Sequence, residues 1–518
     1  ERENPVGGRE GSDDGEGGGE GDAESTGDAA GAGPLDLPGP DQLRRHGLRV
    51  AVASGDSGAD DLDDETEEEA AEAEADERAK EDDGPLAPCS EDEAYVRIVI
   101  SEHEYWELQE RCWEESLERD ADGQAEDSET PTLAEDADED DQLARTPGSH
   151  DEDDGGQALL DRALRAQKMN SVYDSFNLRV IHERRRTGFE DTKELRVFKG
   201  MVLAGRYEVK SVVGEAAFST ALSCTDVEAN KRVCVKVIKN NKDYFDQSLD
   251  EIRLLKYINS SCKDPDAKHI IRMYDYFYHK EHLFIVTELL DQNLYAMSRD
   301  EMPLRGTKSP NRFFTLGNVR KIARQCLEAL VYISSLGIIH CDIKPENIMV
   351  ADRENVRIKV IDFGSSCFTT DRLSSYIQSR FYRAPEVILG CNYDHRIDVW
   401  SLGACIAEIC TGDVLFESST TTGLLATIVG VLGPFSRSMV RRGRFSSKWL
   451  LGDVIYERDE EAQSGAAILY PRRQSLHRRL GSPSDSRFLD FIRTLLTKDP
   501  RHRPSADMAL RHPWLLDD

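Results

Sequence analysis

A short segment between two β-rich runs has features of a phosphate-binding hairpin. Residues 213–221 read Val-Gly-Glu-Ala-Ala-Phe-Ser-Thr-Ala. Backbone N–H groups presented by a glycine-containing turn can bind the phosphates of a nucleotide. By itself the signal is weak, because only Gly214 of three expected glycine positions is kept and Ala216 and Ser219 fill the other two. An ordinary turn would explain this segment as well.

A lysine and a glutamate further along the chain are placed to form a buried ion pair. Lys236 ends the β-rich run Val-Cys-Val-Lys, and we expect it to point into a cleft. Glu251 lies in a helical stretch among apolar neighbours. A buried lysine requires a carboxylate partner, and Glu251 supplies one. Together these residues are suited to hold the α- and β-phosphates of a nucleotide.

Three further motifs follow in order. They read His340-Cys-Asp-Ile-Lys-Pro-Glu-Asn347, Ile361-Asp-Phe-Gly364 and Ala384-Pro-Glu386. With the hairpin and the lysine–glutamate pair, they resemble the signature set of the protein kinases in order and spacing. One such motif would carry little weight, whereas five linked motifs make a chance match negligible. The resemblance implies a protein-kinase fold and transfer of the γ-phosphate of ATP to proteins.

The resemblance assigns a role to each motif residue. Phosphoryl transfer has a loose transition state, so positioning and charge neutralisation do most of the work. Asp342 would accept or orient the substrate hydroxyl, and Lys344 would stabilise the transferring phosphoryl group. Asn347 and Asp362 would hold Mg²⁺, a hard cation suited to oxygen ligands. The expected catalytic set is Asp342, Lys344, Lys236 and Glu251.

The same resemblance outlines an ATP site and its support. Thr287 falls at the gatekeeper position, and Cys234 would form part of the adenine roof unless it is a plain core cysteine. Asp398 would hydrogen-bond the catalytic loop, and Glu386 would pair with Arg503. The residues expected to contact ATP are Val213, Gly214, Ala216, Ser219, Ala221, Cys234, Lys236, Thr287, Glu288 and Leu290.

Departures from the general kinase pattern narrow the family. The catalytic loop reads His-Cys-Asp, residues 365–368 read Ser-Ser-Cys-Phe, and residues 375–383 read Ser-Tyr-Ile-Gln-Ser-Arg-Phe-Tyr-Arg. These segments look like the dual-specificity tyrosine-regulated (DYRK) kinases of the CMGC group. Residues 185–190 and 240–248 are similar to the plant-type branch. Homeodomain-interacting kinases share the His-Cys-Asp loop, but Tyr-Ile-Gln-Ser-Arg favours the DYRK assignment.

This resemblance implies self-phosphorylation of Tyr376. Because Cys341 replaces the arginine that usually clamps an activation-loop phosphate, Arg380 and Arg383 are expected to fold back onto it. The alternative is that Tyr376 is a packed aromatic and both arginines serve the following turn.

Specificity and redox control are further expectations. Substrates would carry Ser or Thr before Pro, with an upstream arginine paired to Glu346, unless Glu346 is only a solvated loop charge. Cys341 and Cys367 flank the catalytic residues. Two free thiols are the default in a reducing compartment, and a reversible disulfide that stops catalysis is the sharper hypothesis.

The hydrophobic pattern of the segments that position these residues changes from a strand period to a helix period along the chain. Residues 207–290 hold short β-rich runs around one helical stretch, and residues 291–516 are mostly helical. We therefore expect an α+β, bilobal kinase domain at 207–516: a small antiparallel-sheet N-lobe with one main helix, and a larger helical C-lobe. Ligands commonly bind in the cleft between such lobes. Residues 156–206 would form a helix and an extended segment that pack on this domain or lead into it.

The 518-residue chain is unevenly charged. Residues 1–154 hold 53 of the 99 Asp and Glu residues but 11 of the 65 Lys and Arg, a net charge of −42 within a total of −34. Such a segment cannot offset its ordering entropy, so residues 1–155 should be a disordered acidic tail. Its charge argues against direct nucleic-acid binding. No apolar run approaches the ~18 residues of a membrane span.

One short island, at residues 93–118, interrupts this tail. Residues 95–100 suggest a strand, and the helix after it would carry Trp106, Trp113 and Leu117 on one side. The island is either a docking element or a weak local helix without a partner, and we slightly favour the second.

The expected partners are protein substrates and ATP, with no direct nucleic acid, no membrane and a monomeric catalytic domain. Eleven cysteines without metal-ligand spacing suit a reducing compartment, the cytoplasm or the nucleus. Two rival functions remain: a pseudokinase scaffold, suggested by the glycine-poor hairpin, and a binding module that uses the acidic tail.

Overall fold

The computed structural model describes seven stretches of the chain. They are residues 94–100, 103–110, 176–188, 193–301, 313–371, 376–458 and 466–516. The predictions of a disordered tail, of a helix near residues 157–169, and of roles for Trp113 and Leu117 lie outside the described residues.

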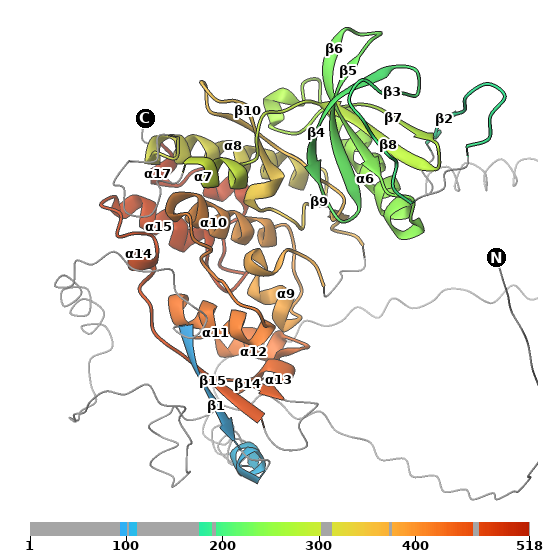
Figure 1. Cartoon of the computed structure of the whole chain (residues 1–518). Coiled ribbons are helices and arrows are strands. Elements are labelled where there is room, and N and C mark those ends of the chain that lie inside the picture. Colours follow the sequence, from blue (N-terminus) through green and yellow to red (C-terminus); the bar gives the residue numbers. More distant parts are fainter. Residues whose placement is uncertain are drawn as a thin grey trace, which may run out of the picture. The chain divides into compact units, whose positions relative to one another are not determined.

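A seven-stranded sheet forms the N-terminal lobe, with strand order β2-β7-β8-β6-β5-β4-β3 (Figure 1). The strands are β2 (Val180–Ile181), β3 (Val202–Leu203), β4 (Tyr207–Glu215), β5 (Ser219–Asp226), β6 (Lys231–Ile238), β7 (Met273–His279) and β8 (His282–Glu288). Helix α6 (Lys242–Ser260) begins at Asn241, whose side chain accepts a hydrogen bond from the Asp243 amide. Its buried Ile252, Leu255 and Ile258 belong to the main core.

The sheet begins before residue 207 and is not wholly antiparallel, unlike the expectation. β2 pairs in parallel with the edge strand β7, Val180 opposite Tyr278. The Phe176 and Tyr276 rings contact edge to face at 5.7 Å. Strands of two residues, β2 and β3, are too short to produce a readable period, so the sequence indicated only an extended segment in this region and not its strand pairing.

The C-terminal lobe is mainly helical and is built around α10 (Arg396–Thr411). Trp400 of α10 is fully buried and stacks on Phe416 at 5.6 Å. The other helices are α7 (Leu294–Glu301), α8 (Leu316–Ser335), α9 (Pro385–Leu389), α11 (Thr421–Leu432), α12 (Arg437–Arg442), α13 (Ser446–Trp449), α14 (Leu476–Arg479), α15 (Ser486–Leu495), α16 (Ala506–Ala509) and α17 (Pro513–Leu516).

Two small antiparallel pairs position the catalytic segments. β10 (Ile348–Asp352) pairs with β11 (Arg357–Val360), and β9 (Ile338–Ile339) pairs with β12 (Cys367–Phe368). The catalytic loop lies between β9 and β10, and the Asp-Phe-Gly motif lies between β11 and β12. Because β9 pairs with β12, the two motifs are held side by side.

A second sheet, not expected from the sequence, lies in the C-terminal lobe. Its order is β1-β15-β14-β13, formed by β1 (Tyr95–Ile100), β13 (Leu450–Leu451), β14 (Val454–Arg458) and β15 (Ala466–Pro471). Figure 1 shows β1 beside β15, although residues 101–465 lie between them in sequence.

The preference for an island without a partner was therefore wrong. β1 pairs antiparallel with β15 over six residues. Helix 103–110 buries Tyr105 and Leu108, whereas Trp106, the expected inward residue, is 51% exposed. The edge of a distant strand supplies the partner, and a local pattern cannot reveal such a contact.

Candidate active site

A charged triad lies in the N-terminal lobe next to the Asp-Phe-Gly motif. The Nζ of Lys236 lies 3.0 and 2.8 Å from the carboxylate oxygens of Glu251, and 3.5 Å from Oδ1 of Asp362. Burial opposes the charge of Lys236, but the two carboxylates raise its pKa. Burial likewise opposes the charge of Asp362, but the Lys236 ammonium lowers its pKa. The charged forms of Lys236 and Asp362 are therefore favoured in a site where an isolated charge would be unfavourable, whereas burial raises the pKa of Glu251.

Three polar side chains from the catalytic loop and the activation segment surround the carboxylate of Asp342. Lys344 Nζ donates to Asp342 Oδ2 at 2.7 Å, and Asn347 Nδ2 donates to the same oxygen at 2.9 Å. The Ser379 hydroxyl donates to Asp342 Oδ1 at 2.6 Å and accepts from Lys344 at 3.0 Å. Sequence reasoning gave no role to Ser379, although it lies inside the Tyr-Ile-Gln-Ser-Arg motif that was singled out.

Asp398 of α10 fixes this loop from below. Its buried carboxylate accepts from the His340 amide at 2.8 Å and from the Cys341 amide at 3.0 Å. Cys341 has φ 63°, a left-handed conformation that non-glycine residues rarely adopt. The two hydrogen bonds stabilise that conformation and so direct Asp342 into the cleft. The second expected support also forms: Arg503 Nη1 lies 2.5 Å from Glu386 Oε1, and both side chains are fully buried.

The phosphate-binding hairpin is formed by β4 and β5. The Ala216 amide donates to the Ser219 carbonyl at 2.8 Å and closes the tip. Val213 and Gly214 lie at the end of β4, and Gly214 pairs with Ala221. Phe218, which the sequence analysis did not single out, lies 5.1 Å from Lys236 Nζ at its ring centroid.

The expected adenine residues lie on adjacent strands. Cys234 of β6 and Thr287 of β8 are direct cross-strand partners, and Thr287 is buried. Glu288 accepts from the Arg272 amide at 2.7 Å and from the buried Lys359. Leu290 is half-buried just beyond. The hinge segment is thus tied to the sheet by the side chain of Glu288.

The two expected Mg²⁺ ligands fit a hard cation. Both hydrogen bonds of the Asn347 amide nitrogen go to Asp342, so its oxygen is the atom left for a ligand. Asp362 contributes a carboxylate and directly follows Ile361, whose amide donates to the Asn347 carbonyl at 3.0 Å. Mg²⁺ is commonly held by one or two protein oxygens together with substrate phosphates. Among the described residues no cluster of three or more His, Cys, Asp or Glu could hold a metal.

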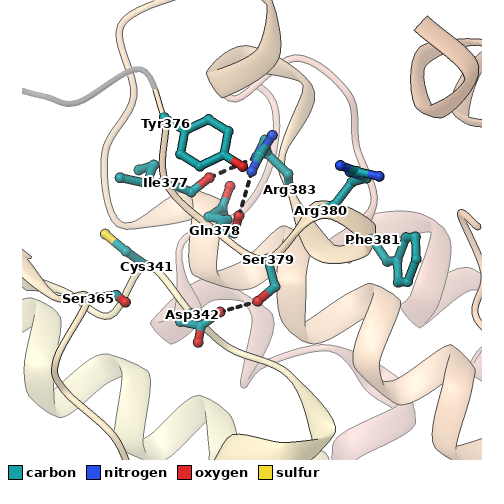
Figure 2. A pocket seen from close by; sticks show the side chains of 10 residues that line it. All are labelled: Cys341, Asp342, Ser365, Tyr376, Ile377, Gln378, Ser379, Arg380, Phe381 and Arg383. Atoms are coloured by element: carbon teal, nitrogen blue, oxygen red, sulfur yellow. Dashed lines mark hydrogen bonds between the residues drawn. The ribbon is translucent and has the colours of Figure 1, made fainter. Parts of the chain in front are cut away.

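A pocket of about 530 Å³ opens beside Asp342 and is lined by the activation segment (Figure 2). Gln378 has φ 66°, and its buried side chain is held by the Ile397 carbonyl, Ser401 and the Ala384 amide. Its own carbonyl accepts from Arg383 Nη2 at 2.9 Å. The wall of the pocket is therefore fixed by buried contacts.

The structure brings Arg383, but not Arg380, to Tyr376. The Arg383 guanidinium lies 4.8 Å from the Tyr376 ring centroid, and its Nε donates to the Ile377 carbonyl at 2.8 Å. Arg380 points away (Figure 2) and donates to the Ser419 carbonyl. Burial lowers the pKa of Arg383, while the neighbouring Tyr376 favours its charge. The Tyr376 side chain is 80% exposed and therefore accessible to modification.

Glu346 belongs to an acidic pair that the sequence did not reveal. Its Oε2 is buried and has no hydrogen-bond partner among the described residues. Glu408 of α10 accepts from the Tyr382 hydroxyl at 2.5 Å. Burial, with repulsion from Glu346, raises the pKa of Glu408 to about 7. The one feature of the sequence that could have indicated this pair is the carboxylate of Glu408 within the otherwise apolar second half of α10.

Cys341 and Cys367 are neighbours. Their sulfur atoms lie 3.6 Å apart, with Cys341 buried and Cys367 half-buried. A hydrogen bond from the Cys341 thiol lowers the pKa of Cys367, and the same contact together with burial raises the pKa of Cys341. Cys367 is therefore the more nucleophilic sulfur of the pair.

Comparison with known proteins extends these observations. The protein kinase domain model matches residues 207–515. The human dual specificity tyrosine-phosphorylation-regulated kinase 4 is 36% identical over 361 residues, which cover 68% of this chain and 64% of the relative. The serine/threonine-protein kinase ppk5 of Schizosaccharomyces pombe is 37% identical over 328 residues, covering 63% and 38%.

Two further likenesses agree. Dual specificity tyrosine-phosphorylation-regulated kinase 2 of Drosophila melanogaster is 35% identical over 332 residues, covering 63% of this chain and 44% of the relative. A crystal structure of a kinase domain superimposes with a TM-score of 0.55 at 26% identity, covering 62% of this chain and 99% of that one. The chain spans 64% or less of the length of these curated relatives. It has the predicted bilobal kinase fold, belongs to the protein kinase family, and within that family is similar to the DYRK members of the CMGC group.

Proposed function

We propose that this chain is a dual-specificity kinase that transfers the γ-phosphate of ATP to Ser or Thr of proteins and phosphorylates its own Tyr376. One observation carries the proposal: the ion pair of Lys236 with Glu251 is formed at 2.8 Å beside Asp362. A pseudokinase scaffold or a pure binding module requires none of these charges. Their assembly in one cleft, with Asp342 nearby, favours turnover.

ATP with Mg²⁺ supplies the phosphoryl group when bound. Lys236 is placed to neutralise the α- and β-phosphates, and the amides of the hairpin to hold them. Asn347 and Asp362 are placed to hold the cation through oxygen atoms. Thr287 and Cys234 form the wall against which adenine would pack. The contacting set proposed for ATP is the one named from the sequence.

Asp342 receives the proton of the substrate hydroxyl in this proposal. Its Oδ1 now accepts from Ser379 at 2.6 Å, so that oxygen is already directed towards the activation-segment pocket. A substrate hydroxyl that replaces this contact would lie beside Lys344, which bonds both Asp342 and Ser379. Lys344 then offsets the negative charge of the transferring group.

The backbone of Gln378 supports selection of proline after the acceptor. Its carbonyl oxygen is engaged by Arg383, so the next substrate residue would find no acceptor there for its N–H. An unpaired N–H removed from water is unfavourable, and proline has none to satisfy. Proline is therefore the residue that binds at this position with the smallest unfavourable free energy, because it leaves no backbone N–H unpaired.

The acidic pair supports selection of arginine before the acceptor. Glu346 has a buried oxygen without a partner among the described residues, and Glu408 is held close to it despite repulsion. A guanidinium can bind two carboxylates through its planar array of donors. We assign Glu346 and Glu408 to a basic substrate residue two or three positions upstream.

A degenerate peptide library with ATP and Mg²⁺ tests the substrate assignment. We expect Ser and Thr acceptors, proline directly after them and arginine two or three residues before. Glu346→Gln should weaken arginine selection and leave proline selection unchanged. Turnover with no preference for proline would contradict the role given to Gln378.

Self-phosphorylation of Tyr376 is tested by expression in bacteria. The chain should carry phosphate on Tyr376, because a phosphate there can form charge-assisted hydrogen bonds to Arg383. The Asp342→Asn chain should lack this phosphate. If it carries the phosphate, the modification is made by another enzyme.

The remaining assignments rest on composition. Protein substrates and ATP are the proposed partners of a monomeric catalytic domain, and the charge of residues 1–154 argues against a direct nucleic-acid partner. The cytoplasm or nucleus fits the scattered cysteines. No helix among the described residues has the length and apolar character needed to cross a membrane.

A further inference from the structure

Residues 94–100 and 103–110, named here together the docking segment, bind the C-terminal lobe through both backbone and side chains. β1 forms a ladder with β15 that runs from Tyr95 opposite Pro471 to Ile100 opposite Ala466. The Arg472 amide donates to the Ala94 carbonyl at 3.0 Å and extends the ladder. Without the segment, β15 would expose a row of unpaired backbone groups.

The docking segment also covers an apolar face. Tyr105 and Leu108 of helix 103–110 pack on Leu451, Val454 and Tyr456 and on the same face of β15, and all of these side chains are buried. The Tyr105 and Tyr456 rings lie 5.9 Å apart. Removal of the segment would expose a contiguous apolar patch, a feature typical of interaction sites.

Helix α11 lies in contact with the segment at two glycines. A Cβ on Gly430 would lie 2.6 Å from the Arg472 carbonyl oxygen and 3.8 Å from that of Ala94. A Cβ on Gly423 would lie 2.3 Å from the Ser418 hydroxyl and 2.9 Å from the Tyr95 hydroxyl. At both positions the nearest atom belongs to the lobe, and an atom of the docking segment lies within 4 Å. A side chain at either position would therefore disturb the lobe and the segment together.

One ion pair and a difference in side-chain exposure accompany the strand pairing. Arg97 of β1 lies 3.8 Å from Glu457 of β14, across the intervening β15. Ile98 faces the covered apolar side and is buried, whereas Val99 faces the other side and is 59% exposed. Along the strand, Ile98 is buried, Arg97 and Val99 are exposed, and Tyr95 packs against the main core. Such strand pairing is the mode in which an extended peptide adds to a sheet edge.

We propose that β15, β14 and α11 form a peptide-docking site separate from the catalytic cleft, and that the docking segment of the same chain is its occupant. The ligand class is an extended six-residue strand with an arginine at its third position, followed by a helix with apolar residues three apart. Residues 111–175 join the segment to β2, so the segment is a tethered ligand of the lobe. The proposal does not depend on the proposed kinase activity.

Binding of the segment in trans tests this proposal. A full-length chain with Ile98→Lys and Leu108→Lys would leave the site empty. A fluorescent peptide of residues 94–110 should bind that chain at least tenfold more tightly than the unmodified chain, measured by anisotropy. A peptide with Val99→Lys should bind equally well, and one with Ile98→Lys should not bind. No binding of the parent peptide to the double variant would overturn the proposal.

Hydrogen exchange on the unmodified chain is the second test, because the double variant could fail to fold. Amides of β1 should exchange through a local opening well before those of α10, since a tethered ligand dissociates without unfolding the lobe. Exchange of β1 only together with α10 would make the segment an integral strand and overturn the proposal. Neither measurement uses phosphoryl transfer, so a failure here is distinguishable from failure of the proposed function.

Discussion

Glu408 shows how a single buried carboxylate can serve binding at a cost in stability. It lies in a helix whose neighbouring side chains are almost all buried and apolar. Its partner, the Tyr382 hydroxyl, supplies only one hydrogen bond to the carboxylate. Above neutral pH the fold must therefore hold a poorly solvated charge. We interpret that charge as held for an incoming arginine.

Glu408→Gln should stabilise the protein at alkaline pH. The pKa of Glu408 is raised from 4.5 to about 7 in the folded chain. Its contribution to stability is thus fully present below pH 4.5 and is lost as pH rises through about 7. At 1.36 kcal/mol per unit, the loss is about 3 kcal/mol. Thermal unfolding should show the variant more stable at pH 8.5 and closer to the unmodified chain at pH 5.5.

The matched control for that prediction is Glu354→Gln, at an exposed glutamate. Its effect on the melting temperature should be the same at both pH values. If Glu408→Gln is destabilising at pH 8.5, the carboxylate makes contacts that this account omits.

The pair Cys341–Cys367 should act as a redox brake on catalysis. Attack of the Cys367 thiolate on hydrogen peroxide gives a sulfenic acid, and the Cys341 thiol then displaces water to form the disulfide. Two thiols are oxidised and one peroxide is reduced to two waters. Activity should fall with peroxide and return with dithiothreitol. The Cys367→Ser chain should keep its activity in peroxide, while Cys262→Ser, at a half-buried cysteine outside this pair, should respond like the unmodified chain.

Mass spectrometry decides this point independently of activity. The oxidised chain should yield a linked Cys341–Cys367 peptide. Loss of activity without that peptide would mean that another oxidation is responsible.

At the scale of elements, replacing Gly430 of helix α11 by alanine should destabilise the protein, although alanine normally stabilises a helix. Gly430→Ala would raise helix propensity, but the new Cβ would meet a backbone carbonyl at 2.6 Å. Backbone cannot move aside as a side chain can, and overpacking typically costs ~1–3 kcal/mol. We expect a lower melting temperature. Gly317→Ala near the start of α8, where the nearest atom would lie at 4.0 Å, should be neutral or stabilising. A more stable Gly430→Ala chain would contradict the close approach.

Sequence reasoning succeeded where local pattern determines an element. The two lobes, the main helix of the N-terminal lobe and the order of the motifs were predictable, because strand and helix periods and short motifs are local properties. The expectation for Arg380 failed because a distant carbonyl, that of Ser419, binds its guanidinium. The pairing of Glu408 with Glu346 was not predicted for the same reason, because it depends on how α10 packs against the catalytic loop.

At the scale of the whole molecule, residues 1–154 and the kinase domain differ in net charge and in how much of their structure the sequence predicts. The net charge of −42 in residues 1–154 suggested a disordered tail, and the strand suggested within it at residues 95–100 is confirmed as β1. Strand pairing between residues 95–100 and 466–471 is a long-range event, and neither segment alone specifies its partner. The acidic region and the kinase domain are therefore joined by structure as well as by sequence.

The central claim is that the assembled cleft transfers phosphate with Asp342 as the proton acceptor. The most direct measurement is transfer from ATP and Mg²⁺ to a peptide with arginine three residues before a Ser-Pro acceptor, for the unmodified chain and for Asp342→Asn. The account predicts measurable transfer, at least ~10²-fold slower in the variant, with ATP affinity and melting temperature unchanged. Equal rates for the two proteins, or no transfer by the unmodified chain, would contradict it.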